Sequence, residues 1–424
     1  MNSMILSLAA AMMLSLSSFA ASVETDRTWY LAGEAMKVSV TADNALIAYA
    51  ELCDAYRLAA GAVIGLKGGK GEKVIELPSH LHSGYYVLSV YTRDGAHAAQ
   101  RLVAVVNPLH KSEDDDIEWV EDKTHPQPLP VEGGEIGYRL FKLPSRTGGV
   151  GGGSETEGHI IKARVKNGTF SGSQICPSLS IVGKQIHYFE GKMVNDSIAV
   201  FYTYGIQGKL PLVLSAVSST GVNLPVEMIS PFAALLPKEL PHLVFHYKRS
   251  EVEARSIDMQ RHQMAIAPAK REAQLGVIAD EMAEEVVPLD YDETAFGTKP
   301  YLTYNLDEYR QFFTVREVLL EYVSCVSNRN VNGVPRLVVY SDQTPNEGSW
   351  PTLVLIDGMP VNDVERLLNY DARRIHYINI YSGQYTFGNG VYNGILSFVT
   401  RSGRLTNYPT EPNVQYLVYD FPET

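Results

Sequence analysis

Two stretches near the C-terminus decide the fold of the last part of this chain: PTLVLIDGMP at residues 351–360 and GILSFVT at residues 394–400. The run at residues 353–356 is continuously apolar, and so is LVVY at residues 337–340. Continuous apolar strands are typical of a sheet that is covered on both faces. Residues 357–360 predict a tight turn, and residues 395–400 predict the closing strand of a small domain.

The neighbouring residues predict short helices and one more strand. Thr314 and Glu317 have the spacing of a capping box before a helix, and Asn362 with Glu365 predicts a second, shorter helix. Apolar and polar residues alternate at residues 377–381, which indicates a strand, and a glycine-rich loop is expected from residue 382 to residue 394. Residues 300–405 should therefore form a small α/β domain.

The order of these pieces resembles the plug domain of TonB-dependent receptors. The matching stretches are residues 351–360, INIYSG at 378–383, YTFG at 385–388 and residues 394–400. The resemblance implies a plug-like signature, which we expect to be structural and to offer a docking surface. Its residues are Asp357, Gly358, Pro360, Gly383, Gly388, Gly390 and Gly394. Glycine at such positions permits positive φ and a close approach of neighbouring backbone.

The chain departs from the plug pattern in three ways. Tyr381 and Ser382 stand where the family usually has a basic residue before the first loop glycine, no TonB-contacting segment is evident near the N-terminus, and no barrel sequence follows residue 405. A plug gates a barrel in receptors, so transport by this chain alone is not expected. Docking on another protein is the remaining expectation for this domain.

The N-terminal segment predicts export. Residues 1–20 contain an apolar run of signal-peptide length, and Ser18 and Ala20 are small residues at the positions that favour cleavage after Ala20. Residues 1–3 lack Lys and Arg, and the alternative interpretation is a buried N-terminal helix. No later run reaches the ~18 apolar residues of a membrane helix. We expect a periplasmic, outer-membrane-associated or cell-surface protein without a transmembrane helix.

Residues 23–108 predict a β-sandwich of immunoglobulin-like architecture, because short alternating strands are separated by glycine turns. The stretches TDRTWYLAGE at residues 25–34, LP at 77–78 and SGYY at 83–86 resemble a macroglobulin-type domain. Such domains open many large envelope proteins of the Bacteroidota. The thioester segment of protease-trapping macroglobulins is absent, so covalent trapping is not expected.

The remaining segments complete a multidomain prediction of two β-sandwich modules followed by the α/β domain. Strand-like runs ending at residues 243–245 predict a second sandwich, and Ser250 with Glu253 predicts the start of a helical connector. The expected segments are a linker at 109–158, the second sandwich at 159–248, the connector at 249–299 and a C-terminal tail at 406–424.

Charge and motif content argue against several functions. The formal charge of −12, from 48 acidic and 36 basic residues, disfavours nucleic-acid binding. Cys53, Cys176 and Cys325 are widely spaced and predict three separate buried residues, without a disulfide or thiolate zinc site. His242 and His246 predict a core-edge pair, and the acidic run at 113–116 a solvated segment. We expect no catalytic residues, metal or cofactor.

Two functional hypotheses remain. The first is a non-catalytic envelope binding or assembly protein whose plug-like domain docks on an outer-membrane barrel or a cell-surface complex. The second is a secreted hydrolase or a protease-interacting, inhibitor-like protein. The macroglobulin-like resemblance alone suggests the second.

Overall fold

The computed structural model describes residues 21–120, 155, 158–166, 168, 170–183, 186–261, 295–331, 334–340, 350–387, 390–403, 405 and 408–423. The chain divides into two compact units. Unit 1 comprises residues 1–156 and 234–259, and unit 2 comprises residues 157–233 and 260–423. Of our sequence predictions, the signal segment at 1–20, residues 121–154 of the expected linker and Gly388 lie outside the described residues.

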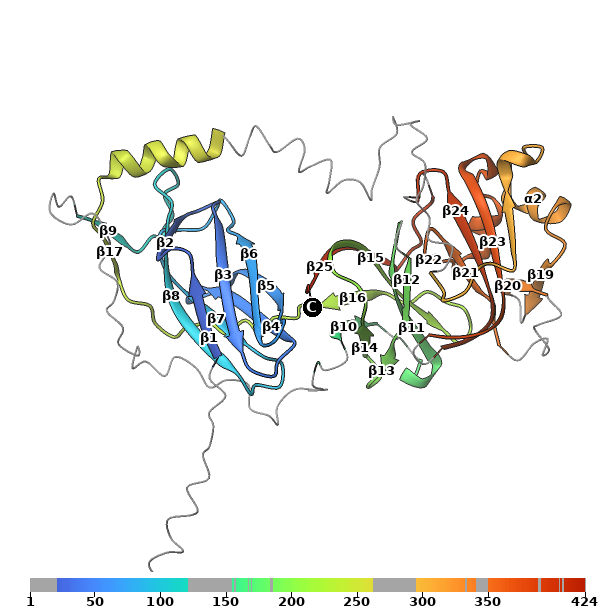
Figure 1. The fold of residues 1–424 in the computed structure, drawn as a ribbon, viewed down its shortest axis with the longest axis horizontal. Helices are drawn as coiled ribbons and strands as arrows, with labels where there is room; N and C mark the ends of the chain where they lie inside the picture. The colour runs from blue at the N-terminus through green and yellow to red at the C-terminus, as the bar shows by residue number, and fades with distance from the viewer. Residues whose placement is uncertain are drawn as a thin grey trace, which may run out of the picture. The chain divides into compact units, whose positions relative to one another are not determined.

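Unit 1 contains the first β-sandwich (Figure 1). One sheet has the order β1-β3-β6, with β1 Ala21–Thr25, β3 Ala35–Ala42 and β6 Lys70–Glu76. The other has the order β2-β8-β7-β4-β5, with β2 Trp29–Leu31, β4 Ile47–Cys53, β5 Leu58–Gly65, β7 Gly84–Tyr91 and β8 Ala98–Val106. Burial alternates along β3, and its inward residues Met36, Val38 and Val40 share one core with Leu52 and Leu88. The period of two therefore places this face toward the opposite sheet.

A two-stranded parallel sheet in unit 1 differs from two of our predictions. β9 (Ile117–Trp119), inside the expected linker, pairs in parallel with β17 (Leu243–Phe245). We had expected residues 243–245 to close the second sandwich, which is wrong. Leu243 and Phe245 are fully buried against residues of the first sandwich, including Leu31. A strand of three residues carries too little pattern to specify its distant partner.

A helix at residues 249–261 follows this layer. It begins one residue before Ser250, which we had expected to be its cap. Val252 is buried with Leu31 and Phe245, so the helix packs on the same apolar cluster. The Arg255 guanidinium lies over the Trp29 ring and forms an ion pair with Glu34 at 2.5 Å. The beginning of the expected connector is thus part of unit 1.

Residues 157–233 belong to unit 2 and separate the two segments of unit 1. Two buried carboxylates bind the chain of unit 1 just before and just after this separation. Glu155 accepts hydrogen bonds from the Tyr49 hydroxyl at 2.7 Å and 2.8 Å and lies 3.2 Å from the Arg93 guanidinium. Glu51 on β4 accepts from the Leu235 backbone N–H at 2.9 Å. A buried carboxylate requires such partners, so these contacts attach both segments to the β4–β7 side of the sandwich.

The second sandwich belongs to unit 2, and the C-terminus completes it. One sheet has the order β13-β14-β10-β16, with β10 His159–Val165, β13 Lys192–Met193, β14 Ile198–Thr203 and β16 Val226–Ile229. The other has the order β12-β11-β15-β25, with β11 Ile175–Ile181, β12 His187–Glu190, β15 Gly208–Ser218 and β25 Gln415–Phe421. The expected tail at 406–424 therefore contains a core strand, and Phe421 is fully buried. The multidomain β-sandwich prediction is confirmed.

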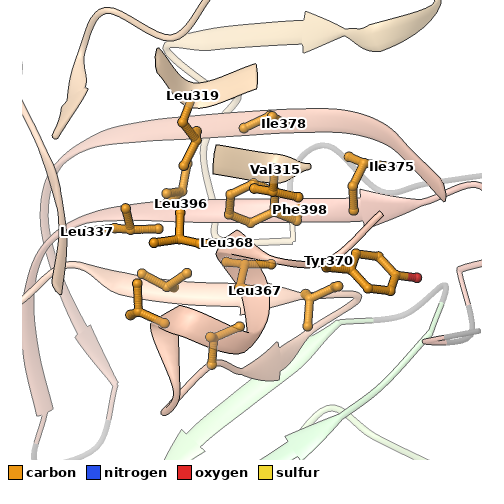
Figure 2. Packing of buried hydrophobic residues seen from close by; sticks show 14 of the residues in the cluster. Val315, Leu319, Leu337, Leu367, Leu368, Tyr370, Ile375, Ile378, Leu396 and Phe398 are labelled. Atoms are coloured by element: carbon orange, nitrogen blue, oxygen red, sulfur yellow. The ribbon is translucent and has the colours of Figure 1, made fainter. Parts of the chain in front are cut away.

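The C-terminal domain is inserted between β16 and β25. Its main sheet has the order β18-β23-β24-β21-β22, with β18 Leu302–Asn305, β21 Leu353–Ile356, β22 Met359–Pro360, β23 Ile375–Phe387 and β24 Gly390–Thr400. Helices α2 (Val315–Glu321) and α3 (Val364–Leu368) contribute to its core. Figure 2 shows Leu319 of α2 and Leu368 of α3 near Leu396 of β24. Burial of these apolar side chains is the main contribution to the free energy that holds the helices on the sheet.

Local predictions in this domain had mixed outcomes. Thr314 caps α2 in a capping box with Glu317, as expected. The cap of α3 is Asp363 rather than Asn362, and its side chain accepts from two backbone N–H groups of the first turn. The expected loop at 382–394 is wrong, because β23 and β24 pair as far as Phe387 and Gly390, with a register shift between Tyr381 and Gln384.

The apolar run at 337–340 also differs from expectation. Residues 337–339 belong to β20 (Val334–Val339), which pairs with β19 (Val326–Val331) in a separate two-stranded sheet. Leu337 and Val339 are buried, whereas Val338 between them is half-buried. One face of this hairpin packs on the domain core, so a continuous apolar run did not require coverage on both faces.

Candidate functional site

The plug-like signature lies largely inside unit 2, where the C-terminal domain meets the second sandwich; we call this contact the seam. Asp357, between β21 and β22, is almost fully buried. Its carboxylate accepts from the Thr400 N–H at 2.7 Å, the Thr400 hydroxyl at 2.5 Å and the Leu405 N–H at 2.9 Å. Its carbonyl accepts from the Gly183 N–H of the second sandwich at 3.1 Å. Asp357 therefore fixes the turn and also joins the two parts.

Two signature glycines allow close approach at the seam. Gly358 has φ +88°, and a Cβ there would lie 2.8 Å from the Ile181 carbonyl oxygen of β11. A Cβ on Gly390 would lie 1.8 Å from an Oε atom of Glu190 on β12. Gly358 therefore excludes larger residues both because a backbone oxygen occupies the space and because of its backbone conformation, whereas a Cβ on Gly390 would meet the end of the Glu190 side chain.

The other signature residues that the structure describes are either packed inside the C-terminal domain or next to unoccupied space. Pro360 is buried in β22. Gly394 has φ +79°, and a Cβ added there would lie 3.2 Å from the Tyr381 carbonyl oxygen. Gly383 has φ +108° and faces open space at the register shift of β23. Because most of the signature is buried within unit 2, it does not itself present the docking surface that we expected.

A tyrosine–carboxylate contact lies beside Gly390. The Tyr392 hydroxyl of β24 donates to Glu190, and the Tyr188 and Tyr392 hydroxyl oxygens are 2.9 Å apart. Tyr188 packs edge-on against Phe387 with ring centroids 5.5 Å apart. Partial burial in this part of the seam raises the pKa of Glu190.

A surface rich in aromatic and arginine side chains occurs on the C-terminal domain, away from the signature residues. We call it the aromatic–arginine surface. It consists of Tyr304, Tyr309, Arg310, Phe312, Phe313, Tyr322, Arg373 and Arg401. Successive ring centroids are 6.1 Å apart for Tyr304–Tyr309, 4.7 Å for Tyr309–Tyr322 and 5.5 Å for Phe312–Tyr322. The rings thus form a continuous row from β18 to the end of α2.

Two arginines of this surface, Arg373 and Arg401, are held in place by neighbouring carboxylates. Arg401 contacts Asp307 at 2.5 Å, and Arg373 contacts Asp371 at 2.8 Å while lying over the Phe313 ring at 5.1 Å. The hydrogen bond from Arg401 holds the pKa of Asp307 below its ordinary value. The pKa of Asp371 is likewise lowered, by the hydrogen bond from Arg373, so both carboxyl groups are negatively charged at neutral pH. Phe313 is 70% exposed.

The surface includes a shallow hollow lined by residues such as Leu306, Tyr309 and Arg310. Its enclosed space is about 10 Å³, roughly the volume needed for one water molecule. Small-molecule sites usually enclose ~300–1,000 Å³. The hollow is therefore too small to enclose a typical small-molecule ligand.

The residues with catalytic or metal-binding potential are dispersed. Within the described ranges, no group of three or more His, Cys, Asp or Glu side chains is placed to hold a metal ion. His242 is half exposed beside Asp116 and Glu118, so the expected core-edge position is wrong for it. Asp115 of the acidic run accepts from Ser83 N at 2.6 Å and Ser112 N at 2.9 Å, which fixes a turn.

The cysteines also differ from the prediction in part. All three are free, and Cys53 is buried as expected. Cys176 is exposed and Cys325 is intermediate in exposure. Among the residues that the structure describes, no helix is both long and apolar enough to cross a membrane.

Comparison with known proteins gives distant similarities only. No protein-family model matches the chain, and no curated protein does. Solved structures that match include the BSP domain of a biofilm-associated protein (10% identity, TM-score 0.18), elastase-activated alpha-2-macroglobulin of Escherichia coli (8%, 0.19) and a DUF4785 family protein of Legionella pneumophila (13%, 0.16).

These matches cover 52%, 51% and 47% of this chain, and 31%, 20% and 52% of the respective matched chains. The chain thus spans at most about half the length of the three proteins. A TM-score below 0.5 does not establish a shared fold. The two-sheet description of each sandwich therefore rests on its own strand order and core.

Proposed function

We propose that this chain is a non-catalytic binding or assembly protein of the cell envelope. It docks through the aromatic–arginine surface on an outer-membrane or cell-surface protein. The observation that carries the proposal is the row of tyrosine and phenylalanine rings flanked by Arg310, Arg373 and Arg401. Aromatic residues and arginine are enriched in the buried centres of protein interfaces, where a few of them supply most of the binding energy.

The way the surface is built supports the same proposal. Arg373 and Arg401 are oriented by ion pairs, and Tyr309 and Tyr322 by mutual ring contact. Side chains that are already oriented lose less conformational entropy when a partner binds. The domain core beneath, formed by residues such as Val318 and Leu306, provides a rigid base.

The envelope location and the domain types are part of the proposal. The apolar segment at residues 1–20 suggests export, and the stretches at 351–360 and 394–400 resemble a receptor plug. The stretch at 25–34 resembles a macroglobulin-type domain of Bacteroidota envelope proteins. A plug-like domain would serve as a docking module.

Co-purification tests the docking surface. The full chain, after mild cross-linking in cells, should recover one membrane or surface partner. Phe313→Ala combined with Arg373→Ala should reduce that recovery at least tenfold, because loss of hot-spot residues costs about 2 kcal/mol or more. Tyr56→Ala is the matched control, since Tyr56 is a 78% exposed aromatic residue of unit 1.

Equal recovery of the partner by the double variant and the wild type would contradict docking at this surface. Protease inhibition or hydrolysis by the purified chain, unaffected by the same substitutions and without any envelope partner, would favour the alternative of a protease-interacting or hydrolytic protein.

A further inference from the structure

Four polar side chains meet at the seam between the second sandwich and the C-terminal domain; we call them the Glu411 cluster. Glu411 lies just before β25 and is 3% exposed. Asn223, between β15 and β16, belongs to the second sandwich. Asn362, before α3, and Tyr408, after β24, belong to the C-terminal domain. The cluster therefore contains side chains from both parts of unit 2.

Both carboxyl oxygens of Glu411 are held by the protein. One accepts from the Asn223 side-chain amide at 3.0 Å. The other accepts from the backbone N–H groups of Asn362 and Asp363 at 3.2 Å and 3.3 Å. These contacts place the two asparagines around one carboxyl group. They also orient the Asn223 amide, because only its nitrogen can donate to a carboxylate.

Three other polar atoms of the cluster are buried and have no hydrogen-bond partner among the residues that the structure describes. They are Asn223 Oδ1, Asn362 Nδ2 and the Tyr408 hydroxyl oxygen. Burial, followed by the charges of Glu411 and Asp363, raises the pKa of Tyr408, so its hydroxyl lies near the same carboxyl groups. Folded proteins seldom leave such groups unpaired, because the groups are hydrogen-bonded to water in the unfolded chain.

The three atoms have complementary chemistry. Asn362 Nδ2 is a donor, Asn223 Oδ1 is an acceptor and the Tyr408 hydroxyl can be either, yet no direct hydrogen bond joins them. Donors and acceptors that are near one another but too far apart for direct contact are commonly bridged by water. A cation cannot accept from Asn362 Nδ2, and an anion has no proton to donate to Asn223 Oδ1. A shared ligand must both donate and accept.

We propose that one water molecule binds at the Glu411 cluster and joins the second sandwich to the C-terminal domain. It accepts from Asn362 Nδ2, donates to Asn223 Oδ1 and makes its third hydrogen bond with the Tyr408 hydroxyl. About three hydrogen bonds are typical of a buried water in a folded protein. The water links the two parts of unit 2 beside the direct contacts that Glu411 makes with both.

The position of the cluster gives this water access to solvent. Thr410 and Pro412, on either side of Glu411, are exposed, and the asparagines are partly exposed although the atoms named above are buried. The cluster thus lies at the rim of the seam. None of its residues belongs to the aromatic–arginine surface, so the water site does not depend on the proposed docking function.

Removal of the Tyr408 hydroxyl distinguishes a hydrated cluster from a dry one. If the hydroxyl is bonded to water, Tyr408→Phe should raise the urea-unfolding equilibrium constant of unit 2 about two- to tenfold, because one hydrogen bond is lost. If the hydroxyl is unpaired, the same substitution removes a group that is costly to bury. An unchanged or lowered constant would therefore contradict the proposal.

The measurement and its control use the full chain. A brief deuterium pulse at each urea concentration distinguishes the units, with peptides from β12 and β24 for unit 2 and from β3 and β7 for unit 1. Tyr202→Phe makes the same chemical change on β14, where the tyrosine is 53% exposed, and should leave the constant unchanged.

A high-resolution crystal structure of the full chain locates the water directly, and it decides the question even if Tyr408→Phe does not fold. We expect an ordered water within hydrogen-bond distance of Asn223 Oδ1, Asn362 Nδ2 and the Tyr408 hydroxyl oxygen. Direct hydrogen bonds among these three atoms, a metal ion between them or a cluster without ordered water would overturn the proposal.

Discussion

At the scale of single residues, Gly358 is where backbone conformation and packing constrain the chain together. Its φ is +88°, and the Ile181 carbonyl oxygen occupies the space next to its Cα. We expect Gly358→Ala to destabilise unit 2 by about 2–4 kcal/mol, since a left-handed conformation costs roughly 1 kcal/mol and overpacking ~1–3 kcal/mol. Urea unfolding of unit 2 measures the change.

Gly297 provides the matched control for that substitution. Its φ is +80°, but nothing lies within 4 Å of its Cβ position. Gly297→Ala should therefore cost only the conformational part, about 1 kcal/mol. Equal destabilisation by both substitutions would mean that close approach to the second sandwich is unimportant.

The same scale explains what the sequence could predict of the site. The stretch at 351–360 predicted a turn at Asp357 and Gly358, because a short polar residue followed by glycine favours one. It could not show that Ile181, more than 170 residues earlier, approaches position 358 so closely that only glycine fits there. The aromatic–arginine surface was not predicted, since its residues come from three separate segments, near 304–322, 373 and 401.

At the scale of elements, strand positions were easier to predict than strand partners. Residues 243–245 were expected as a strand and are one, but they pair with β9 rather than with the second sandwich. β25 was missed altogether, although its Leu417, Tyr419 and Phe421 alternate with polar residues and with Val418. Alternation identifies a buried face, whereas the partner depends on contacts distant in sequence.

β25 provides a test at this scale. Phe421 is fully buried in the core of the second sandwich, while Val418 on the same strand is 47% exposed. Phe421→Ala should destabilise unit 2 by about 3–5 kcal/mol, and Val418→Ala by less than about 1 kcal/mol. Thermal unfolding of the two variants would show the difference. Similar small shifts would mean that the C-terminal strand contributes little to the fold.

At the scale of the whole molecule, the chain passes between its units more than once. Unit 1 resumes after residue 233, and the C-terminal domain lies between two strands of the second sandwich. The sequence suggested modules that follow one another along the chain. Changes in composition indicate where a segment begins and ends, but they do not show that a later strand pairs with a sheet formed earlier in the chain. The consequence for function is that the aromatic–arginine surface is carried by a domain attached through both of its ends.

Site-specific photo-cross-linking in cells most directly tests whether the chain docks through the aromatic–arginine surface. A photoreactive phenylalanine at position 313, on the aromatic–arginine surface, should give one dominant cross-linked envelope protein. The same group at position 56, which is at least as exposed on unit 1, should not give that product. Identical products from both positions, or none from position 313 in cells where the partner co-purifies with the chain, would contradict docking through this surface.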